Sequence, residues 1–369
     1  MIHFVVPADQ EFGMRDYLSL WGSSLADRVR ILHYESLPVL SHLNSGTYIL
    51  AALDQLRPPM LGLVQQLHQR LSGVDGFRIL NHPTRTLRRY DLLTELRRMN
   101  RNEFGAVRAT ENAGELRFPV FVRAESSHTG ALSPLLHSAS EVEAAIGRAL
   151  IQGYQLRDLL VVEFCDTVDA NGYYRKYAAF AVGNRVIARS LSYGRRWLLK
   201  HAGIEFSRAM VAEELEYVQQ NPHESELAEI FEIAGVGYGR IDYAIKNNRV
   251  QTWEINLNPT IGRGQRPSSS RIPAELAPLR EEVKQCFYSR FQSAMEHLDF
   301  STPRSAIHIS YDERMVRAAA SGKNRNGRFL GVMRHVLAPI KPLLVPLGSR
   351  MLPWAGRLAR HYGRRHKPK

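Results

Sequence analysis

The sequence predicts a mixed α/β protein, in which an open α/β domain precedes two α+β lobes and an extended basic tail. Three observations predict this: apolar runs alternate with helical patterns at the start, strand-like runs with tight turns follow, and basic residues gather at the end. A length of 369 residues suits two or three packed units. We place the open domain at 1–100, the small lobe at 101–170, the large lobe at 171–300, and the linker and tail at 301–369.

The first domain is predicted from four strand-like runs, namely IHFVVP, RVRILHYESL, TYILAAL and FRILNHP. Between the last two, apolar residues from Met60 to Leu71 recur at helical spacing, and Gly73 is a stop signal. A second helix is expected over TLRRYDLLTELRRMN. Strands that alternate with helices indicate an open α/β sheet.

The middle of the chain predicts antiparallel strands. FPVFVR runs into a polar loop that closes at Gly130, and Ser140 with Glu143 predicts a capping box for a helix through Leu150. Tight turns are expected at Asn171-Gly172 and at Gly183-Asn184. Helices are expected around 207–234, and an amphipathic helix runs from about Leu279 to Met295.

Composition excludes several classes. Cys165 and Cys286 stand far apart, which argues against a disulfide framework or a zinc site and indicates a reducing compartment. The N-terminus lacks the pattern of a signal peptide, and no long apolar run predicts a membrane span. We therefore expect a cytoplasmic protein.

The net charge of +13 is unevenly distributed. The segment from Lys323 to Lys369 holds twelve of the 49 Lys and Arg residues and none of the 36 Asp and Glu residues, so the rest is almost neutral. Apolar clusters and the prolines at 339, 342, 346 and 353 interrupt this basic tail. Its pattern suits an anionic membrane surface, at the inner face of the membrane, or else an acidic partner or the protein's own body; nucleic acid ranks third because the tail has few aromatic residues.

The stretch GYGRIDYAIKNNRVQTWEINLNPTIGRG, residues 237–264, carries carboxylates on strand-like sequence. Two carboxylates on one sheet repel each other unless something positive lies between them. A two-residue turn at Asn247-Asn248 would set Asp242 opposite Trp253, whereas a three-residue loop would pair Asp242 with Glu254. We expect the three-residue loop, over 247–249, which also pairs Arg240 with Asn256.

In that register, carboxylate and amide oxygens from Asp242, Glu254 and Asn256 share one face. Such oxygens suit Mg²⁺, or Mn²⁺, with its remaining ligands supplied by water and substrate phosphates. Arg240 on the same face would neutralise a phosphoryl group during transfer. A solvated strand with ordinary surface charges is the alternative for this segment.

Arg240, Asp242, Glu254, Asn256, Asn258 and Pro259 form an R-x-D, hairpin, E-x-N-x-N-P pattern that resembles the ATP-grasp superfamily. The resemblance covers about residues 1–300 and implies an α/β domain followed by two lobes that clasp ATP. It implies that ESSHTG covers the phosphates and that VVEFCDT is the adenine hinge, with Asp166 or Asp169 on the ribose. The implied nucleotide contacts are Arg89, Arg123, Ser126, Ser127, Thr129, Gly130, Glu163, Cys165, Asp166 and Lys176.

Arg89 and Arg123 depart from the family, which uses lysine at these two ATP-contacting positions. Arginine keeps the charge, but its longer, planar side chain binds phosphate in a different geometry. Arg189 and Lys200 are further candidates for contacts with phosphate or an acidic substrate, against the alternative of ordinary surface charges.

The resemblance implies an ATP- and Mg-dependent ligase in which a small-molecule carboxylate forms an acyl phosphate and an amine, thiol or hydroxyl displaces phosphate. Arg240 would be the catalytic residue. Two alternatives are a kinase that phosphorylates a hydroxyl and a degenerate nucleotide-binding scaffold protein. The identity of the acid and of the acceptor does not follow from the sequence, because variable segments build those pockets.

Overall fold

The computed structural model describes residues 1–127, 130–199, 203–262, 272–300 and 306–321. Its N-terminal part is built on a parallel sheet with the strand order β2-β1-β4-β5. Buried apolar side chains on β1 and β4 form its centre, and α2 covers it with Met60, Leu63, Val64, Leu67 and Leu71. The elements are β1 (Ile2–Val6), α1 (Phe12–Leu20), β2 (Val29–His33), β4 (Gly46–Leu50), α2 (Pro58–Leu71) and β5 (Phe77–Leu80).

A three-stranded antiparallel sheet follows α3 (Arg89–Arg98), in the order β6-β8-β7. Its strands are β6 (Ala106–Arg108), β7 (Val120–Ala124) and β8 (Leu159–Glu163), and α4 (Ala139–Ile151) packs against β7. The N-cap of α4 lies two residues before the predicted one. Ser138, not Ser140, accepts the N–H of Glu141, whose carboxylate in turn accepts the N–H of His137. The helix begins two residues earlier than predicted because this pair satisfies its first N–H groups.

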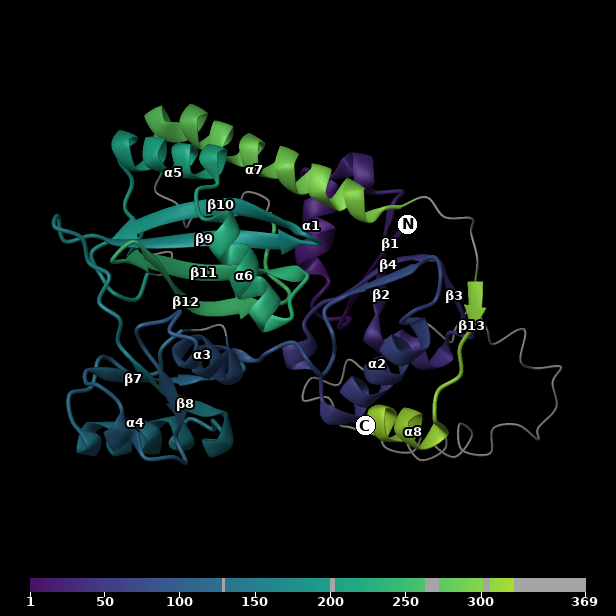
Figure 1. Cartoon of the computed structure of the whole chain (residues 1–369), viewed down its shortest axis with the longest axis horizontal. Coiled ribbons are helices and arrows are strands. Elements are labelled where there is room, and N and C mark those ends of the chain that lie inside the picture. The colour runs from purple at the N-terminus through teal and green to yellow at the C-terminus, as the bar shows by residue number, and fades with distance from the viewer. Residues whose placement is uncertain (128–129, 200–202, 263–271, 301–305, 322–369) are drawn as a thin grey trace, which may run out of the picture. The chain divides into compact units, whose positions relative to one another are not determined.

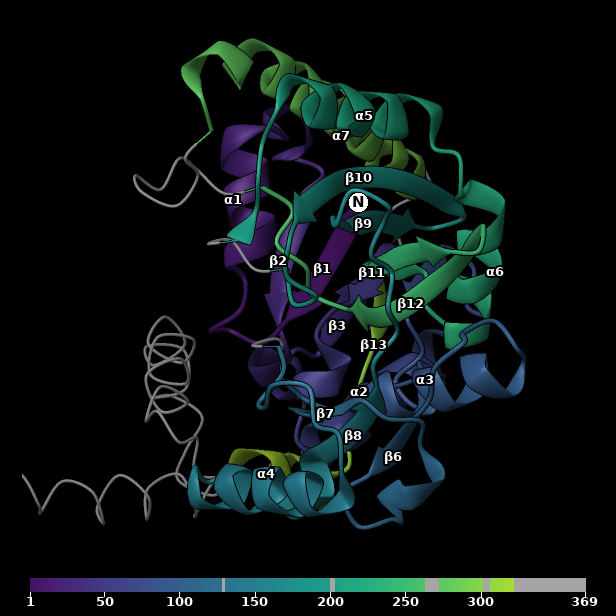
Figure 2. The same cartoon turned by 90° about the vertical axis from the view of Figure 1, so that its left-hand side faces the viewer.

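The four-stranded antiparallel sheet has the order β10-β9-β11-β12. The turns at Asn171-Gly172 and Gly183-Asn184 lie where the sequence predicts them. Figures 1 and 2 both show α5 and α7 side by side over the β10 side of this sheet. The elements are β9 (Tyr174–Val182), β10 (Arg185–Gly194), α5 (Arg208–Gln220), α6 (Glu224–Ala234), β11 (Tyr238–Lys246), β12 (Arg249–Asn256) and α7 (Ala277–Leu298).

The predicted fold class is confirmed, since a parallel α/β sheet precedes two antiparallel sheets with helices. Met1–Ala320 form one compact unit, while the boundaries at 100 and 170 stay predictions. This unit includes part of the predicted linker: β13 (Ala306–His308) pairs with β3 (His42–Asn44), and α8 (Glu313–Ser321) follows.

The predicted tail, 323–369, and its proposed membrane or acidic partner lie outside the described residues. Within the part that the structure describes, no helix combines the length and apolarity needed to cross a bilayer.

Candidate functional site

The β11–β12 hairpin pairs Asp242 with Glu254 and Arg240 with Asn256, as predicted, but by a different route. The predicted three-residue loop was wrong: Lys246 pairs with Arg249, so the turn holds only Asn247 and Asn248, both with positive φ. The strand register shifts between Asp242 and Tyr243, which leaves Trp253 as an extra residue on β12. This β-bulge restores the pairing that a two-residue turn alone would have broken.

Asp242 is buried and carries two cationic partners. The guanidinium of Arg240 binds its carboxylate with both Nε, at 2.8 Å, and Nη2, at 3.2 Å. Lys176 Nζ, from the neighbouring strand β9, lies 2.8 Å from Asp242 Oδ2. Burial opposes the charged form of Arg240, but attraction to Asp242 outweighs it and raises the pKa of Arg240.

Glu254 is held by two arginines that come from other elements of the fold. Arg89 Nη2 and Arg123 Nη2 both reach Glu254 Oε2, the latter at 3.0 Å. Arg89 begins α3 and Arg123 lies on β7, so these ion pairs join α3 and the three-stranded sheet to β12 of the four-stranded sheet. Burial and the nearby charge of Arg89 lower the pKa of Arg123 to about 10, which leaves it protonated at neutral pH.

The predicted phosphate loop begins directly beside these arginines. Arg89 Nη1 donates to the carbonyl oxygens of Ala124 and Ser127, each at 3.0 Å. Asp158 accepts the N–H of Ser126 at 3.1 Å and its hydroxyl at 2.7 Å. These hydrogen bonds therefore fix the position of the start of the loop. The loop ends at Gly130, whose φ is 98°. Thr129 lies outside the described residues, as does Lys200.

Asn256 and Asn258 organise the chain after β12. Asn256 Oδ1 accepts the backbone N–H of Asn258 at 2.9 Å, and Asn258 Nδ2 donates to the carbonyl oxygen of Gln10 at 3.0 Å. The second contact links this segment to the loop after β1.

In the predicted hinge, the carboxylate of Glu163 is bound by groups of the protein itself. Glu163 accepts the N–H of Gly105 at 2.9 Å and the N–H of Arg117 at 2.8 Å, and the guanidinium of Arg117 also binds it, at 3.0 Å. Burial alone would raise the pKa of Glu163, but these bonds outweigh it and hold the pKa below its usual value. Cys165 is buried, and burial raises the pKa of its thiol to about 11, as expected for a small buried side chain.

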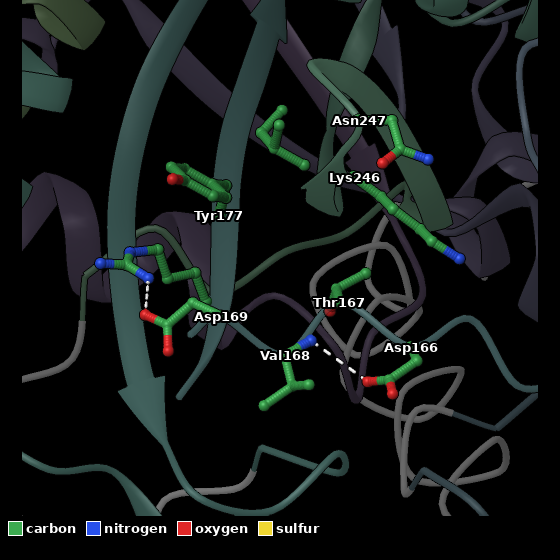
Figure 3. Close-up of a pocket in the computed structure, with 9 residues that line it drawn as sticks. Asp166, Thr167, Val168, Asp169, Tyr177, Lys246 and Asn247 are labelled. Carbon is green, nitrogen blue, oxygen red and sulfur yellow. Dashed lines mark hydrogen bonds and ion pairs between the residues drawn. The ribbon is translucent and has the colours of Figure 1, made fainter. Parts of the chain in front are cut away.

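Asp166 and Asp169 line a cavity of about 310 Å³ together with Tyr177 and Lys246. Figure 3 shows the loop that carries the two aspartates on one side of this cavity and Lys246 with Asn247 on the other. Tyr177 follows Lys176 on β9, and consecutive strand residues point to opposite faces. Because Lys176 binds Asp242, the cavity lies on the other face of the sheet from the two paired carboxylates. The structure does not bring the two predicted ribose aspartates together with them.

Sequence reasoning missed Asp158, which fixes Ser126, and Arg117, which neutralises Glu163. Both are distant in sequence from the groups they bind and belong to no motif, so no local pattern could have indicated them.

The donor set around Asp242 can accept a divalent cation only together with an anion. No group of three His, Cys, Asp or Glu side chains in the described ranges could hold a metal by itself. Four cationic side chains, from Lys176, Arg240, Arg89 and Arg123, surround the two carboxylates. Two carboxylates and an amide fit Mg²⁺ that arrives with a polyphosphate, whose charge the four cations would balance.

No protein-family model and no curated protein matches the sequence. Solved structures with a similar arrangement include a D-alanine–D-alanine ligase from Bacillus anthracis complexed with ATP (12% identity, 80% of this chain and 99% of that chain, TM-score 0.43). Others are an ATP-grasp RimK domain protein from Sphaerobacter thermophilus (12%, 78% and 98%, 0.43) and an L-amino acid ligase from Bacillus licheniformis (10%, 69% and 66%, 0.38).

Proposed function

We propose that this protein is an ATP- and Mg-dependent ligase that joins a small-molecule carboxylate to an amine. The observation that carries the proposal is the face of β11 and β12 on which Asp242 lies opposite Glu254 and Arg240 opposite Asn256. Carboxylates are placed there at paired positions, and each has cationic partners that a bound polyphosphate could take over.

Asp242, Glu254 and Asn256 would hold the magnesium ion. When bound, Mg²⁺ would supply charge neutralisation to the phosphate oxygens of ATP. The chain's own cations add to this effect, since Arg89 and Arg123 lie beside the start of the 125–130 loop and Lys176 and Arg240 lie on the sheet. Their role is to position the nucleotide and to stabilise charge on the phosphoryl group that is transferred.

The proposed reaction has two steps. A carboxylate oxygen of the first substrate attacks the γ-phosphorus, the bond to the β-phosphate oxygen breaks, and ADP leaves. The amine of the second substrate then attacks the acyl carbon, loses a proton, and expels inorganic phosphate. Arg240 is the cation best placed to stabilise the transferred group, because the same guanidinium is anchored on the candidate metal ligand Asp242.

The test is ADP release by the full-length chain with Mg-ATP and pools of amino acids and carboxylic acids. A ligase releases equal amounts of ADP and inorganic phosphate, and only when both substrates are present. ADP that appears with a phosphorylated alcohol and without free phosphate would instead identify a kinase. No ADP release above the rate of an Asp242→Asn variant, with any pool, would contradict the proposal.

A further inference from the structure

Strand β10 contains an extra residue at Arg189. Ala188 pairs with Ala179 on β9, whereas Ser190 pairs with the next residue, Ala178, so Arg189 has no partner in the ladder. A bulge of this kind turns a side chain away from the direction that strand alternation would give it.

The guanidinium of Arg189 lies against aromatic rings of α7. Its central carbon is 4.4 Å from the ring centroid of Phe287 and 5.5 Å from that of Tyr288. One long hydrogen bond, 3.4 Å from Nη2, reaches the carbonyl oxygen of Ile261. These rings hold the planar group in place and leave most of its N–H donors for another partner.

Among the residues that the structure describes, Arg189 has no acidic partner. The segments outside the described residues contain no Asp or Glu side chain, so every acidic side chain of the protein can be checked. None lies within 4.0 Å of the Arg189 guanidinium. Arg175, Arg240 and Arg280 are different in this respect, because each binds a carboxylate.

Two cations interact with Arg189, namely Arg240 and Arg280, and each of them already has a carboxylate partner. Burial lowers the pKa of Arg189, and the charge of Arg240 acts in the same direction. Arg280, on α7, has its pKa lowered to about 10 by burial and by the charge of Arg189, although Arg280 itself is paired with Glu214. Of these three arginines, Arg189 is the one without a carboxylate partner among the described residues, so a bound anion would offset the free-energy cost of its burial.

We propose that Arg189 binds a carboxylate group of the substrate, held bidentately by the guanidinium that lies against the rings of Phe287 and Tyr288. This inference rests on the proposed ligase function. It adds to that function the residue that would bind the substrate carboxylate. Arg240 connects the two parts of the site, since it binds the candidate metal ligand Asp242 and lies close enough to Arg189 to affect its pKa. The phosphoryl group would then lie on the Asp242 side of Arg240 and the carboxylate on the Arg189 side.

The anion could in principle be a carboxylate or a phosphate, and both are oxyanions that arginine binds. Four other cations already surround the candidate phosphate position at Asp242 and Glu254. Arg189 is on β10, with β9 between it and β11, and packs on α7 instead. This separation favours the substrate carboxylate.

The experiment measures thermal unfolding midpoints of the full-length chain in sodium acetate and in sodium phosphate, each against chloride at constant ionic strength. The variants are Arg189→Met, which keeps an apolar stem on the aromatic rings, and Arg189→Lys, which keeps the charge. The matched control is Arg185→Met on the same strand, whose guanidinium contacts Ser293 and His297 rather than Phe287 and Tyr288. Calorimetric titration with Mg-ATP is run on the same proteins.

We expect acetate to raise the midpoint of the wild type and of Arg185→Met in a saturable way, and to have no such effect on Arg189→Met. Arg189→Lys should retain part of the rise, and Mg-ATP affinity should stay within about threefold of wild type in all four proteins. An equal acetate effect in wild type and Arg189→Met overturns the inference, and so does a loss confined to phosphate. If the wild type binds no Mg-ATP but its acetate effect still requires Arg189, the ligase proposal fails and the anion site stands.

Discussion

Asp242 on β11 lies directly opposite Glu254 on β12, although the turn between these strands holds only two residues. The extra residue that makes this possible is Trp253, which packs against a cluster that includes Leu93 and Phe104. The packing of one tryptophan is therefore coupled to the register of the candidate metal ligands. Bulges commonly occur next to active sites, where they change the direction in which a side chain points.

The two-residue turn predicts a specific response at Asn248, whose φ is 56°. Asn248→Gly should leave the free energy of unfolding unchanged or raise it slightly, because glycine accepts this conformation without strain. Asn248→Val should lower it by about 1 to 3 kcal/mol, because a β-branched residue is strained there. Urea unfolding of the two variants checks this, and equal stabilities would contradict the turn geometry.

Removing the Asp242 carboxylate should destabilise the protein in the absence of nucleotide. Asp242→Asn leaves Arg240 and Lys176 without their shared anion, although both are partly exposed and solvent would reduce the cost. We expect a loss of about 1 to 3 kcal/mol in the free energy of unfolding. If instead the midpoint of thermal unfolding rises, repulsion between the carboxylates dominates over their ion pairs.

Sequence reasoning could predict most strands, most helices and the pairing of Asp242 with Glu254, because hydrophobic periodicity and one spaced motif carry that information. It could not place the cations that neutralise the carboxylates: Arg89 and Arg123 reach Glu254 from other elements, and only tertiary packing brings them there. The turn length was wrong for a related reason. A bulge at Trp253 depends on contacts with a cluster far away in sequence, which local turn rules do not include.

Glu163 should contribute to stability in a pH-dependent way. Its pKa in the folded protein lies below its ordinary value of 4.5, so its contribution is present above that pH and is lost as the pH falls through the folded pKa. Glu163→Gln should therefore be less stable than wild type by about 1 to 2 kcal/mol at pH 7. The difference should shrink below about pH 4.5. Urea unfolding at several pH values, with the exposed Glu115→Gln as control, measures it; a difference that does not change with pH would contradict the ion pair with Arg117.

Arg123 should contribute to nucleotide affinity mainly through its charge. Arg123→Ala should weaken Mg-ATP binding about tenfold, which corresponds to about 1.4 kcal/mol, while Arg123→Lys should weaken it much less. Calorimetric titration compares the two. Equal losses would mean that the planar guanidinium is required, and no loss in either would remove Arg123 from the site.

The most direct test of the proposed site is calorimetric titration of wild type, Asp242→Asn and Glu254→Gln with ATP, with and without Mg²⁺. Glu281→Gln, a carboxylate on α7 bound to Lys284, serves as the control. We predict that Mg²⁺ strengthens ATP binding to the wild type and to Glu281→Gln at least tenfold, and that this gain is lost in both site variants while circular dichroism confirms that they are folded. The same Mg²⁺-dependent gain in folded Asp242→Asn and Glu254→Gln as in the wild type would contradict the assignment of the metal and nucleotide to this face of the sheet.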